Sequence, residues 1–325
     1  MRSYSEKSDN TSVDVIYVSR TWIKIEFSLF LIGELLSIPC YLFVTYHFLA
    51  HKSTRRALHN HVIILLLFFN FIDLTIDLSL TMKYSLQGMV APFSPMICLI
   101  WQFVDYGIWY GSISLMFWAT VERHILVFYS QITRTKRGRF FAHYLPLSFF
   151  SLYTPLLYFY LIFIHPCDRN FLSTSVRCGP LCYFDIAPIW FIYYDSLANY
   201  TIPILLITVF STILILRFLK QKRRLKEPIR WYQGRKMIIQ LTLVSIAYLV
   251  FDLPYIIIII VQSSGYPNFA SDILTPYITR LAYVPPIILP YATLLSLPRI
   301  KQKFQALFIW RRLNRQAMAS STVVW

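Results

Sequence analysis

Six carboxylates stand out because they lie in long apolar stretches of the chain, where charge is rarely found. An ionised side chain at the centre of a membrane helix costs about 2.5–3.5 kcal/mol, so such acids face a protein interior or a wet cavity, or take up a proton. Their chemistry would be the binding of a cation, the transfer of a proton or hydrogen bonding to buried hydroxyls. They are Glu26, Glu34, Asp73, Asp77, Asp105 and Asp252.

Helical spacing places several of these acids beside amides and aromatic rings. Residues three, four, seven or eight positions apart share one face of a helix. The groups with this spacing are Asn70 with Asp73 and Asp77, Trp101 with Asp105 and Trp109, and Tyr248 with Asp252 and Tyr255. Aromatic walls around a desolvated carboxylate suit a cation. The alternative is a structural acid that accepts hydrogen bonds from tyrosines, and the spacing leaves both open.

The elements that carry these acids are expected to cross a membrane. The chain has 325 residues, of which 57% are hydrophobic and 14% charged. Soluble proteins are about 45–50% apolar and about 25% charged, which argues against a cytosolic enzyme. A membrane helix needs about 20 mostly apolar residues. The stretches that qualify are seven: 22–49, 60–84, 96–128, 142–164, 190–219, 237–261 and 273–297.

We therefore expect an all-α membrane protein, a seven-transmembrane helix bundle. Residues 1–21 form a polar tail without the apolar core of a signal peptide, and residues 22–297 form the bundle. Residues 298–325 are expected to begin with a short amphipathic eighth helix on the membrane surface, followed by a tail. The apolar residues that give this helical spacing are Ile300, Phe304, Leu307 and Phe308.

Basic residues are concentrated on one side of the predicted membrane. Of the 31 Lys and Arg residues, 23 lie at the end of span three, in the connections after spans one, three and five, or after span seven. Basic loops stay in the cytoplasm, which predicts a multi-pass plasma-membrane protein with an extracellular N-terminus and a cytoplasmic C-terminus. The net charge of +16 then reflects orientation and attraction to membrane lipid, not nucleic acid binding. Asn10 begins a glycosylation sequon on the outer side.

Four cysteines fall on the predicted outer side, where disulfides can form. Cys98 heads span three, and Cys167, Cys178 and Cys182 share one loop, so a bridge is expected to tie this loop to span three. We favour Cys98–Cys182, because Cys182 lies nearest span five, with Cys167–Cys178 closing a small hairpin. The exchange of Cys178 and Cys182 is the rival pairing, and four unpaired thiols are a third possibility.

The triplet Glu122-Arg123-His124 ends span three and follows Cys98 by the spacing found in a known family. With the seven spans, it resembles a rhodopsin-like (class A) G-protein-coupled receptor, in particular divergent invertebrate chemoreceptor-like members. The prolines Pro203, Pro254 and Pro290 sit where this family has its helix-bend prolines. The triplet is then expected to couple to the G protein. Because a lone arginine near the membrane is costly, Glu122 is expected to hold Arg123 until a partner competes; an ion pair without signalling is the alternative.

The resemblance also implies a binding site and partners. In amine receptors of this family an aspartate at the position of Asp105 binds the ammonium group of the ligand, and Tyr283 falls at the position of the tyrosine partner. The partners would be a heterotrimeric G protein, an extracellular small-molecule or peptide ligand and membrane lipid, with no cofactor and no metal. The residues expected to line the ligand cavity are Asp105, Trp109, Asp252, Tyr255 and Tyr283.

Some positions depart from the family pattern. Asn70 stands at the usual aspartate of span two, and Asp252 replaces the tryptophan of span six. Span seven reads Leu289-Pro290-Tyr291-Ala292-Thr293, without the asparagine and tyrosine of the usual motif.

Other function classes fit less well. Residues 273–297 contain no lysine that could bind retinal as a Schiff base. The histidines lie at predicted membrane edges rather than in metal-binding clusters, and no catalytic constellation indicates an enzyme. The runner-up is an ion- or proton-coupled transporter that uses the intramembrane acids, although the repeats typical of transporters are not found.

Overall fold

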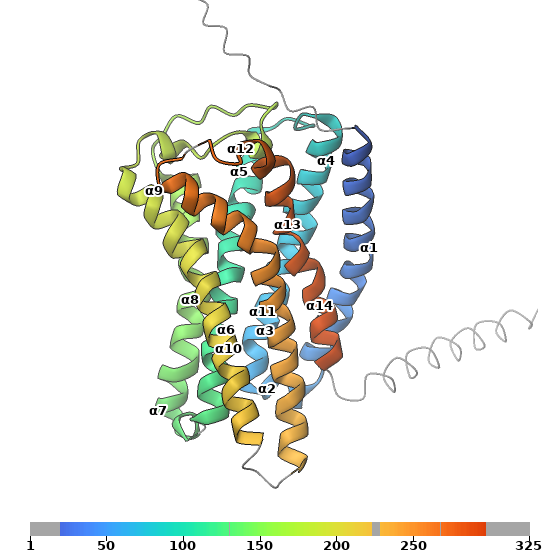
Figure 1. Ribbon diagram of the computed structural model, residues 1–325, viewed down its shortest axis with the longest axis vertical. Helices are drawn as coiled ribbons and strands as arrows, with labels where there is room; N and C mark the ends of the chain where they lie inside the picture. The colour runs from blue at the N-terminus through green and yellow to red at the C-terminus, as the bar shows by residue number, and fades with distance from the viewer. Residues whose placement is uncertain (1–19, 130, 223–227, 267, 297–325) are drawn as a thin grey trace, which may run out of the picture.

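The computed structural model describes residues 20–129, 131–222, 228–266 and 268–296 of the chain. Within these residues the regular structure is helical, and none of them lies in a β-strand. The long helices run side by side along the long axis of the molecule, and loops connect them at its two ends (Figure 1). The predicted eighth helix and the sequon at Asn10 lie outside the described residues.

The helical segments follow the seven predicted spans, and most spans consist of α-helix interrupted by π-helical turns. Span one is α1 (Arg20–Ala50); span two is α3 (Leu58–Ile72), the π-turn η1 (Asp73–Leu78) and α4 (Ser79–Gln87); span three is α5 (Pro95–Gln102), the π-turn η2 (Phe103–Ile108) and α6 (Trp109–Phe128). Span four is α7 (Lys136–Arg139), the π-turn η4 (Phe140–Tyr144), α8 (Leu145–Phe159) and the π-turn η5 (Tyr160–Ile164).

Span five is α9 (Ile189–Ser196), the π-turn η8 (Leu197–Thr201) and α10 (Ile202–Lys222), and span six is α11 (Pro228–Ser263). Span seven is α12 (Ser271–Ile273), the π-turn η9 (Leu274–Ile278), α13 (Thr279–Leu281) and α14 (Val284–Ser296). The connections hold α2 (Lys52–Arg56) and the 3-10 turns η3 (Ile132–Arg134), η6 (Val176–Cys178) and η7 (Cys182–Asp185).

The surface of the bundle is that of a membrane protein. Among the described residues, five helices are long and apolar enough to cross a membrane. The face of α1 that points away from the bundle carries Leu29, Ile32, Leu35 and Leu36, with 56–65% of each residue exposed. A soluble monomer rarely exposes an apolar surface of this extent, whereas lipid tails solvate it well. The protein is therefore a multi-pass membrane protein, and the predicted all-α bundle is confirmed.

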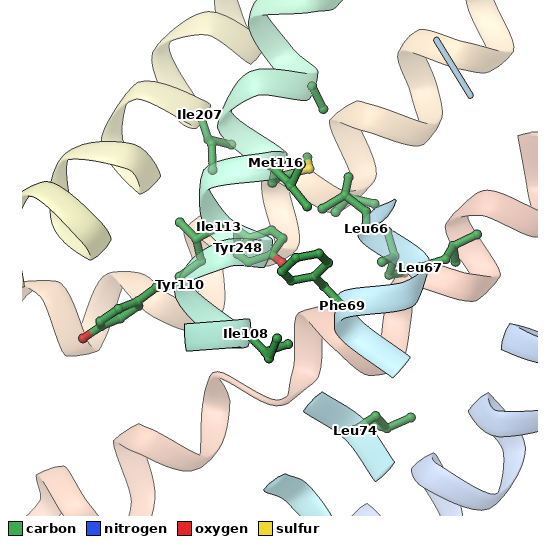
Figure 2. Close-up of a cluster of buried hydrophobic side chains, with 14 of the residues drawn as sticks. Leu66, Leu67, Phe69, Leu74, Ile108, Tyr110, Ile113, Met116, Ile207 and Tyr248 are labelled. Carbon is green, nitrogen blue, oxygen red and sulfur yellow. The ribbon is translucent and has the colours of Figure 1, made fainter. Parts of the chain in front are cut away.

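The core of the bundle lies between spans two, three, five and six. Figure 2 shows side chains from these spans meeting around Met116 and Ile113 of α6, with Leu66 of α3, Ile207 of α10 and Tyr248 of α11. All five residues are buried. Because hydrophobic attraction between helices is weak within lipid, such close packing is a main source of association. This core holds the spans that carry the acids in register.

Gly111 allows α3 and α8 to approach α6 closely, and we expect its replacement by alanine to destabilise the bundle. An added Cβ would lie 2.7 Å from Cε1 of Phe69 on α3 and 3.1 Å from Oγ1 of Thr154 on α8. Overpacking a filled core typically costs about 1–3 kcal/mol. Thermal unfolding of the detergent-solubilised Gly111→Ala variant should show a lower melting temperature.

Gly33 offers a matched control for this substitution. Its added Cβ would meet only the flexible tip of Ile287, at 3.2 Å. We expect Gly33→Ala to change the melting temperature less than Gly111→Ala does. Equal melting temperatures for Gly111→Ala and the wild type would show that the two neighbouring helices are not held by this contact.

Candidate functional site

Two disulfides anchor the loop between spans four and five over one end of the bundle, which we call the disulfide end. They join Cys98 to Cys178 and Cys167 to Cys182, with Cα–Cα distances of 5.6 and 5.8 Å. The favoured pairing Cys98–Cys182 is therefore wrong, and the rival pairing is the one observed. Nearness to span five along the chain did not decide the pairing, because the side chain of Gln102 holds the segment around Cys178 over α5. Its Nε2 donates to the carbonyl oxygens of Arg177 and Gly179, at 3.1 and 3.3 Å.

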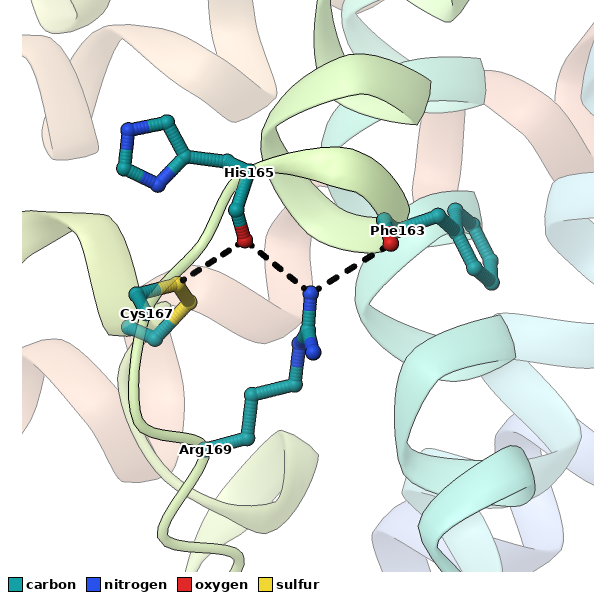
Figure 3. The surroundings of a disulfide bond; sticks show 5 residues. Phe163, His165, Cys167 and Arg169 are labelled. Carbon is teal, nitrogen blue, oxygen red and sulfur yellow. Dashed lines mark hydrogen bonds between the residues drawn. A yellow bond between two sulfur atoms is a disulfide. The ribbon is translucent and has the colours of Figure 1, made fainter.

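The second disulfide lies where span four ends, and the loop caps that end. Figure 3 shows Nη2 of Arg169 donating to the carbonyl oxygens of Phe163 and His165, at 3.4 and 3.2 Å. A basic side chain at the last carbonyls of a helix satisfies acceptors that have no partner within the helix. The loop is thus fixed both to span four and to span three.

A small cavity of about 60 Å³ lies beneath this loop. It is enclosed by residues of spans two, three, five, six and seven and by the loop itself. Four of the five residues predicted to line a ligand cavity do line it, namely Asp105, Trp109, Tyr255 and Tyr283. The lining residues that the sequence did not single out for this role are Asp77, Tyr106, Tyr110, Arg177, Tyr200, Ile278, Thr279 and Ala282.

Asp252, the fifth predicted residue, does not line this cavity. Its carboxylate is buried, and Oδ1 accepts a hydrogen bond of 3.1 Å from the hydroxyl of Tyr200, a residue that lines the cavity. Within the described residues, Oδ2 of Asp252 has no hydrogen-bond partner. The structure therefore connects Asp252 to the cavity through Tyr200 and not by direct lining.

The cavity holds an ion pair between a span and the loop. Nε of Arg177 lies 2.9 Å from Oδ1 of Asp105, whose side chain is only 7% exposed. Burial by itself would lower the pKa of Arg177, but the carboxylate of Asp105 and the neighbouring tyrosine Tyr106 raise this pKa well above its ordinary value. The guanidinium is therefore charged at every physiological pH. Asp105, which was predicted to bind the cation of a ligand, is thus already paired with a cation of the protein.

Asp77 forms the second acidic wall of the cavity. Its Oδ1 accepts a hydrogen bond of 2.5 Å from Nε1 of Trp101, and its Oδ2 accepts one of 2.8 Å from the hydroxyl of Tyr283. The hydroxyl of Tyr283 also lies 2.9 Å from Oγ1 of Thr81. The helix-face pattern in span two gave a signal for Asp77, but nothing in the sequence tied it to span seven.

Of the other predicted acids, Glu26 and Glu34 have partners elsewhere in the bundle, whereas Asp73 has none among the described residues. Glu34 accepts a hydrogen bond of 2.7 Å from Oγ of Ser79, and Glu26 pairs with Nε of Arg280 at 3.4 Å. Asp73 is buried, and neither of its carboxylate oxygens has a hydrogen-bond partner among the described residues. These three acids do not line the cavity.

Sequence reasoning missed a seventh acid, Asp195 in span five. It is 2% exposed and accepts hydrogen bonds at Oδ1 from the hydroxyl of Tyr158 and, at 3.1 Å, from Nδ2 of Asn199. Asn199 is itself buried. Like Asp105 and Asp77, Asp195 lies in or beside a π-helical turn, a feature that is frequent at functional sites.

The triplet at the other end of span three is buried, but its charges are paired differently from expectation. Oε1 of Glu122 is bound by Nδ1 of His143 in span four, and no ion pair joins Glu122 to Arg123 in the described part of the chain. The expected ion pair between Glu122 and Arg123 is therefore not observed among the described residues. Consecutive residues of a helix point in different directions, so span four, which faces Glu122, supplies the partner.

Arg123 is 1% exposed and has few partners. Its Nη2 donates to the carbonyl oxygen of His59 at 3.2 Å, and its Nε and Nη1 have no hydrogen-bond partner among the described residues. His124, the third residue of the triplet, lies with Nε2 2.8 Å from the carbonyl oxygen of Phe210 in span five. His143, the partner of Glu122, also contacts a second histidine: its Nε2 lies 2.9 Å from Nδ1 of His61.

The three prolines lie where the sequence placed them within the spans. Pro254 and Pro290 are inside α11 and α14, and Pro203 is in the first turn of α10, directly after the π-turn η8. A proline inside a membrane helix removes one backbone hydrogen bond and is tolerated where neighbours satisfy the freed carbonyl.

The sequence and the fold both have known counterparts. The model of the family described as 7 transmembrane receptor (rhodopsin family) matches residues 41–291, whereas no curated protein matches the chain. Among solved structures, the crystal structure of squid rhodopsin is similar, with a TM-score of 0.61 and 15% sequence identity over 89% of this chain and 86% of the other. At this identity the likeness shows the fold alone. The family match covers most of the chain, so the protein belongs to the rhodopsin family of seven-transmembrane receptors, which are not enzymes.

Proposed function

We propose that the protein is a G-protein-coupled receptor that binds an extracellular ligand in the cavity at the disulfide end and signals through the opposite end to a heterotrimeric G protein. The N-terminus would be extracellular and the C-terminus cytoplasmic, as the distribution of basic residues indicates. The observation that carries the proposal is the cavity between Asp105 and Asp77, with aromatic walls and a loop fixed above it. Few convergent polar groups in a largely aromatic pocket are typical of a ligand site.

The opposite end offers a group that a partner protein could bind. Arg123 is charged and buried, and two of its guanidinium nitrogens lack hydrogen-bond partners among the described residues. An unpaired buried charge is costly, so an arrangement of the helices in which a partner satisfies Arg123 would gain stability. A ligand that favours this arrangement by its differential affinity would shift the population toward it.

Nucleotide exchange on a G protein tests this proposal. Membranes that contain the protein should accelerate GTP exchange on co-expressed G proteins above mock membranes, with a panel of small amine and guanidinium compounds as ligand probes. A transporter would instead move solute across sealed vesicles without any G protein. Solute flux with no nucleotide exchange for any G protein in the panel would contradict the receptor proposal.

Replacing Arg123 by alanine should reduce this exchange at least about tenfold, which corresponds to a loss of about 1.4 kcal/mol of interaction with the G protein. The reason is that the variant lacks the charge that the partner would satisfy. Surface expression, measured in parallel, should persist. Lys83→Ala, which changes an exposed cation at the disulfide end, is the control and should keep wild-type exchange. Full exchange by Arg123→Ala would assign the coupling to other residues.

A further inference from the structure

The guanidinium of Arg177 lies where a cationic ligand of the acid site would lie. Its Nε is 2.9 Å from Oδ1 of Asp105, and the side chain lines the cavity together with Asp77, Trp109 and Tyr283. Carboxylates and aromatic faces are the surroundings that bind ammonium and guanidinium groups. The loop thus supplies to the site a group of the same chemistry that the site would select from solution.

The backbone holds Arg177 in this position at some cost. Arg177 and Cys178 both adopt left-handed backbone conformations, with φ values of 56° and 62°. A residue other than glycine in this region costs on the order of 1–3 kcal/mol and persists where the surroundings hold it. The disulfide from Cys178 to Cys98 and the two hydrogen bonds from Gln102 do so here. The backbone at Arg177 is therefore fixed by these contacts.

The space left beside Arg177 is too small for an ordinary ligand. The cavity of about 60 Å³ holds a few water molecules, whereas ligand pockets usually measure about 300–1,000 Å³. The side chain of Arg177 is 30% exposed, so it borders both the cavity and the solvent at the disulfide end. A ligand that reaches Asp105 must consequently take the place of this side chain.

The charges in the cavity determine which ligand can do so. Both oxygens of Asp77 accept hydrogen bonds from the neutral donors Trp101 and Tyr283. Asp105, by contrast, has Arg177 as its ion-pair partner. A neutral ligand that displaced Arg177 would leave Asp105 as a buried carboxylate without a counter-charge or force it to take up a proton, and an anionic ligand would add a second negative charge. A cation replaces the lost charge.

We propose that Arg177 is a tethered cation that occupies the ligand position beside Asp105, and that the soluble ligand is an ammonium- or guanidinium-type cation that competes with it. The inference rests on the proposed function in so far as it uses the same cavity as the ligand site. Beyond that function, the inference states that the ligand is a cation and that Arg177 competes with it, so that Arg177 sets the ligand concentration needed for binding.

The test is chemical rescue by a small cation, read out without any G protein. Arg177→Ala removes the tethered guanidinium and leaves Asp105 beside an open space. Millimolar methylguanidinium should then raise the melting temperature of purified Arg177→Ala, saturably and by at least about 2 °C. The melting temperature of the wild type, whose site is filled by Arg177, should rise much less. Arg169→Ala is the control: Arg169 belongs to the same loop but lies outside the cavity, so this variant should also respond much less.

The double variant Asp105→Asn/Arg177→Ala identifies the group that binds the probe. It should lose the response to methylguanidinium, because no carboxylate remains beside the vacated position. A response equal to that of Arg177→Ala would overturn the proposal, and so would equal responses of Arg177→Ala and the wild type. If Arg177→Ala does not fold, Arg177→Gln removes the charge with a smaller loss of volume and allows the same comparison. Failure of nucleotide exchange would refute the proposed signalling but leave this binding result unaffected.

Discussion

Replacing His143 by leucine should destabilise the bundle by about 3–5 kcal/mol, because it leaves the carboxylate of Glu122 buried without its partner. His143 and Glu122 have side-chain exposures of 0% and 1%, and Nδ1 of His143 binds Oε1 of Glu122 directly. The other oxygen, Oε2, already lacks a hydrogen-bond partner among the described residues. Thermal unfolding or a denaturant titration in detergent should show the loss.

The double variant Glu122→Leu/His143→Leu removes both partners and tests whether the loss of stability in His143→Leu comes from the unpaired carboxylate. Replacing both partners of a buried polar pair by apolar groups is often neutral or stabilising, so the double variant should be more stable than His143→Leu alone. His61→Leu is the control, because it removes a partly exposed histidine that contacts Nε2 of His143 and leaves Glu122 with its partner. It should cost about 1–3 kcal/mol, less than His143→Leu. A double variant no more stable than His143→Leu would contradict the prediction that the loss comes from the unpaired carboxylate of Glu122.

The pairing of Glu122 with span four has a consequence for signalling. Oε1 of Glu122 is bound by His143, and the hydrogen bond of the Arg123 guanidinium among the described residues goes to the carbonyl oxygen of His59. We expect His143→Leu to free Glu122, so that it competes with a G protein for Arg123. The variant should therefore show weaker nucleotide exchange, beyond what its lower stability explains.

The positions of the spans could be predicted from the sequence because a membrane span is a local property. Length and apolar content are sufficient to place a helix in lipid. The prediction of 96–128 for span three, for example, agrees with the observed α5, η2 and α6, which together run from Pro95 to Phe128. Span three is nevertheless not among the five described helices that are long and apolar enough to cross a membrane by these criteria alone.

The composition of the cavity was less predictable, because π-helical turns change which residues share a face. Trp101, Asp105 and Trp109 were expected on one face, but η2 lies between Trp101 and Trp109 and accommodates an extra residue per turn. Trp101 consequently donates to Asp77 of span two, while Asp105 meets the loop. Regular helical spacing cannot reveal this difference.

The loop was the least predictable part of the site, because its position depends on contacts between distant segments. Arg177 carries no signal of its own in the sequence, where its neighbour Cys178 is the one residue that indicates a link to span three. The favoured pairing of Cys98 with Cys182 would have placed a different residue over the cavity. A correct disulfide assignment would therefore have been the one sequence-level route to Arg177.

Removing the disulfide between Cys98 and Cys178 should have an effect comparable to that of His143→Leu. Loss of a native disulfide typically costs about 2–5 kcal/mol, and in the chain-entropy account more for a longer closed loop. This bridge spans 80 residues, whereas the bridge between Cys167 and Cys182 spans 15. Because the first bridge also fixes the left-handed backbone at Arg177, its loss should release the guanidinium from Asp105.

Double serine variants measure this without leaving an odd thiol that could pair wrongly. Cys98→Ser/Cys178→Ser should melt lower than Cys167→Ser/Cys182→Ser, and it should gain the response to methylguanidinium that the wild type lacks. Cys40→Ser, at the free cysteine of the described residues, is the control and should change neither property. If the two double variants melted at the same temperature and neither responded to the cation, the bridge to span three would be a simple cross-link with no part in holding Arg177 in the acid site.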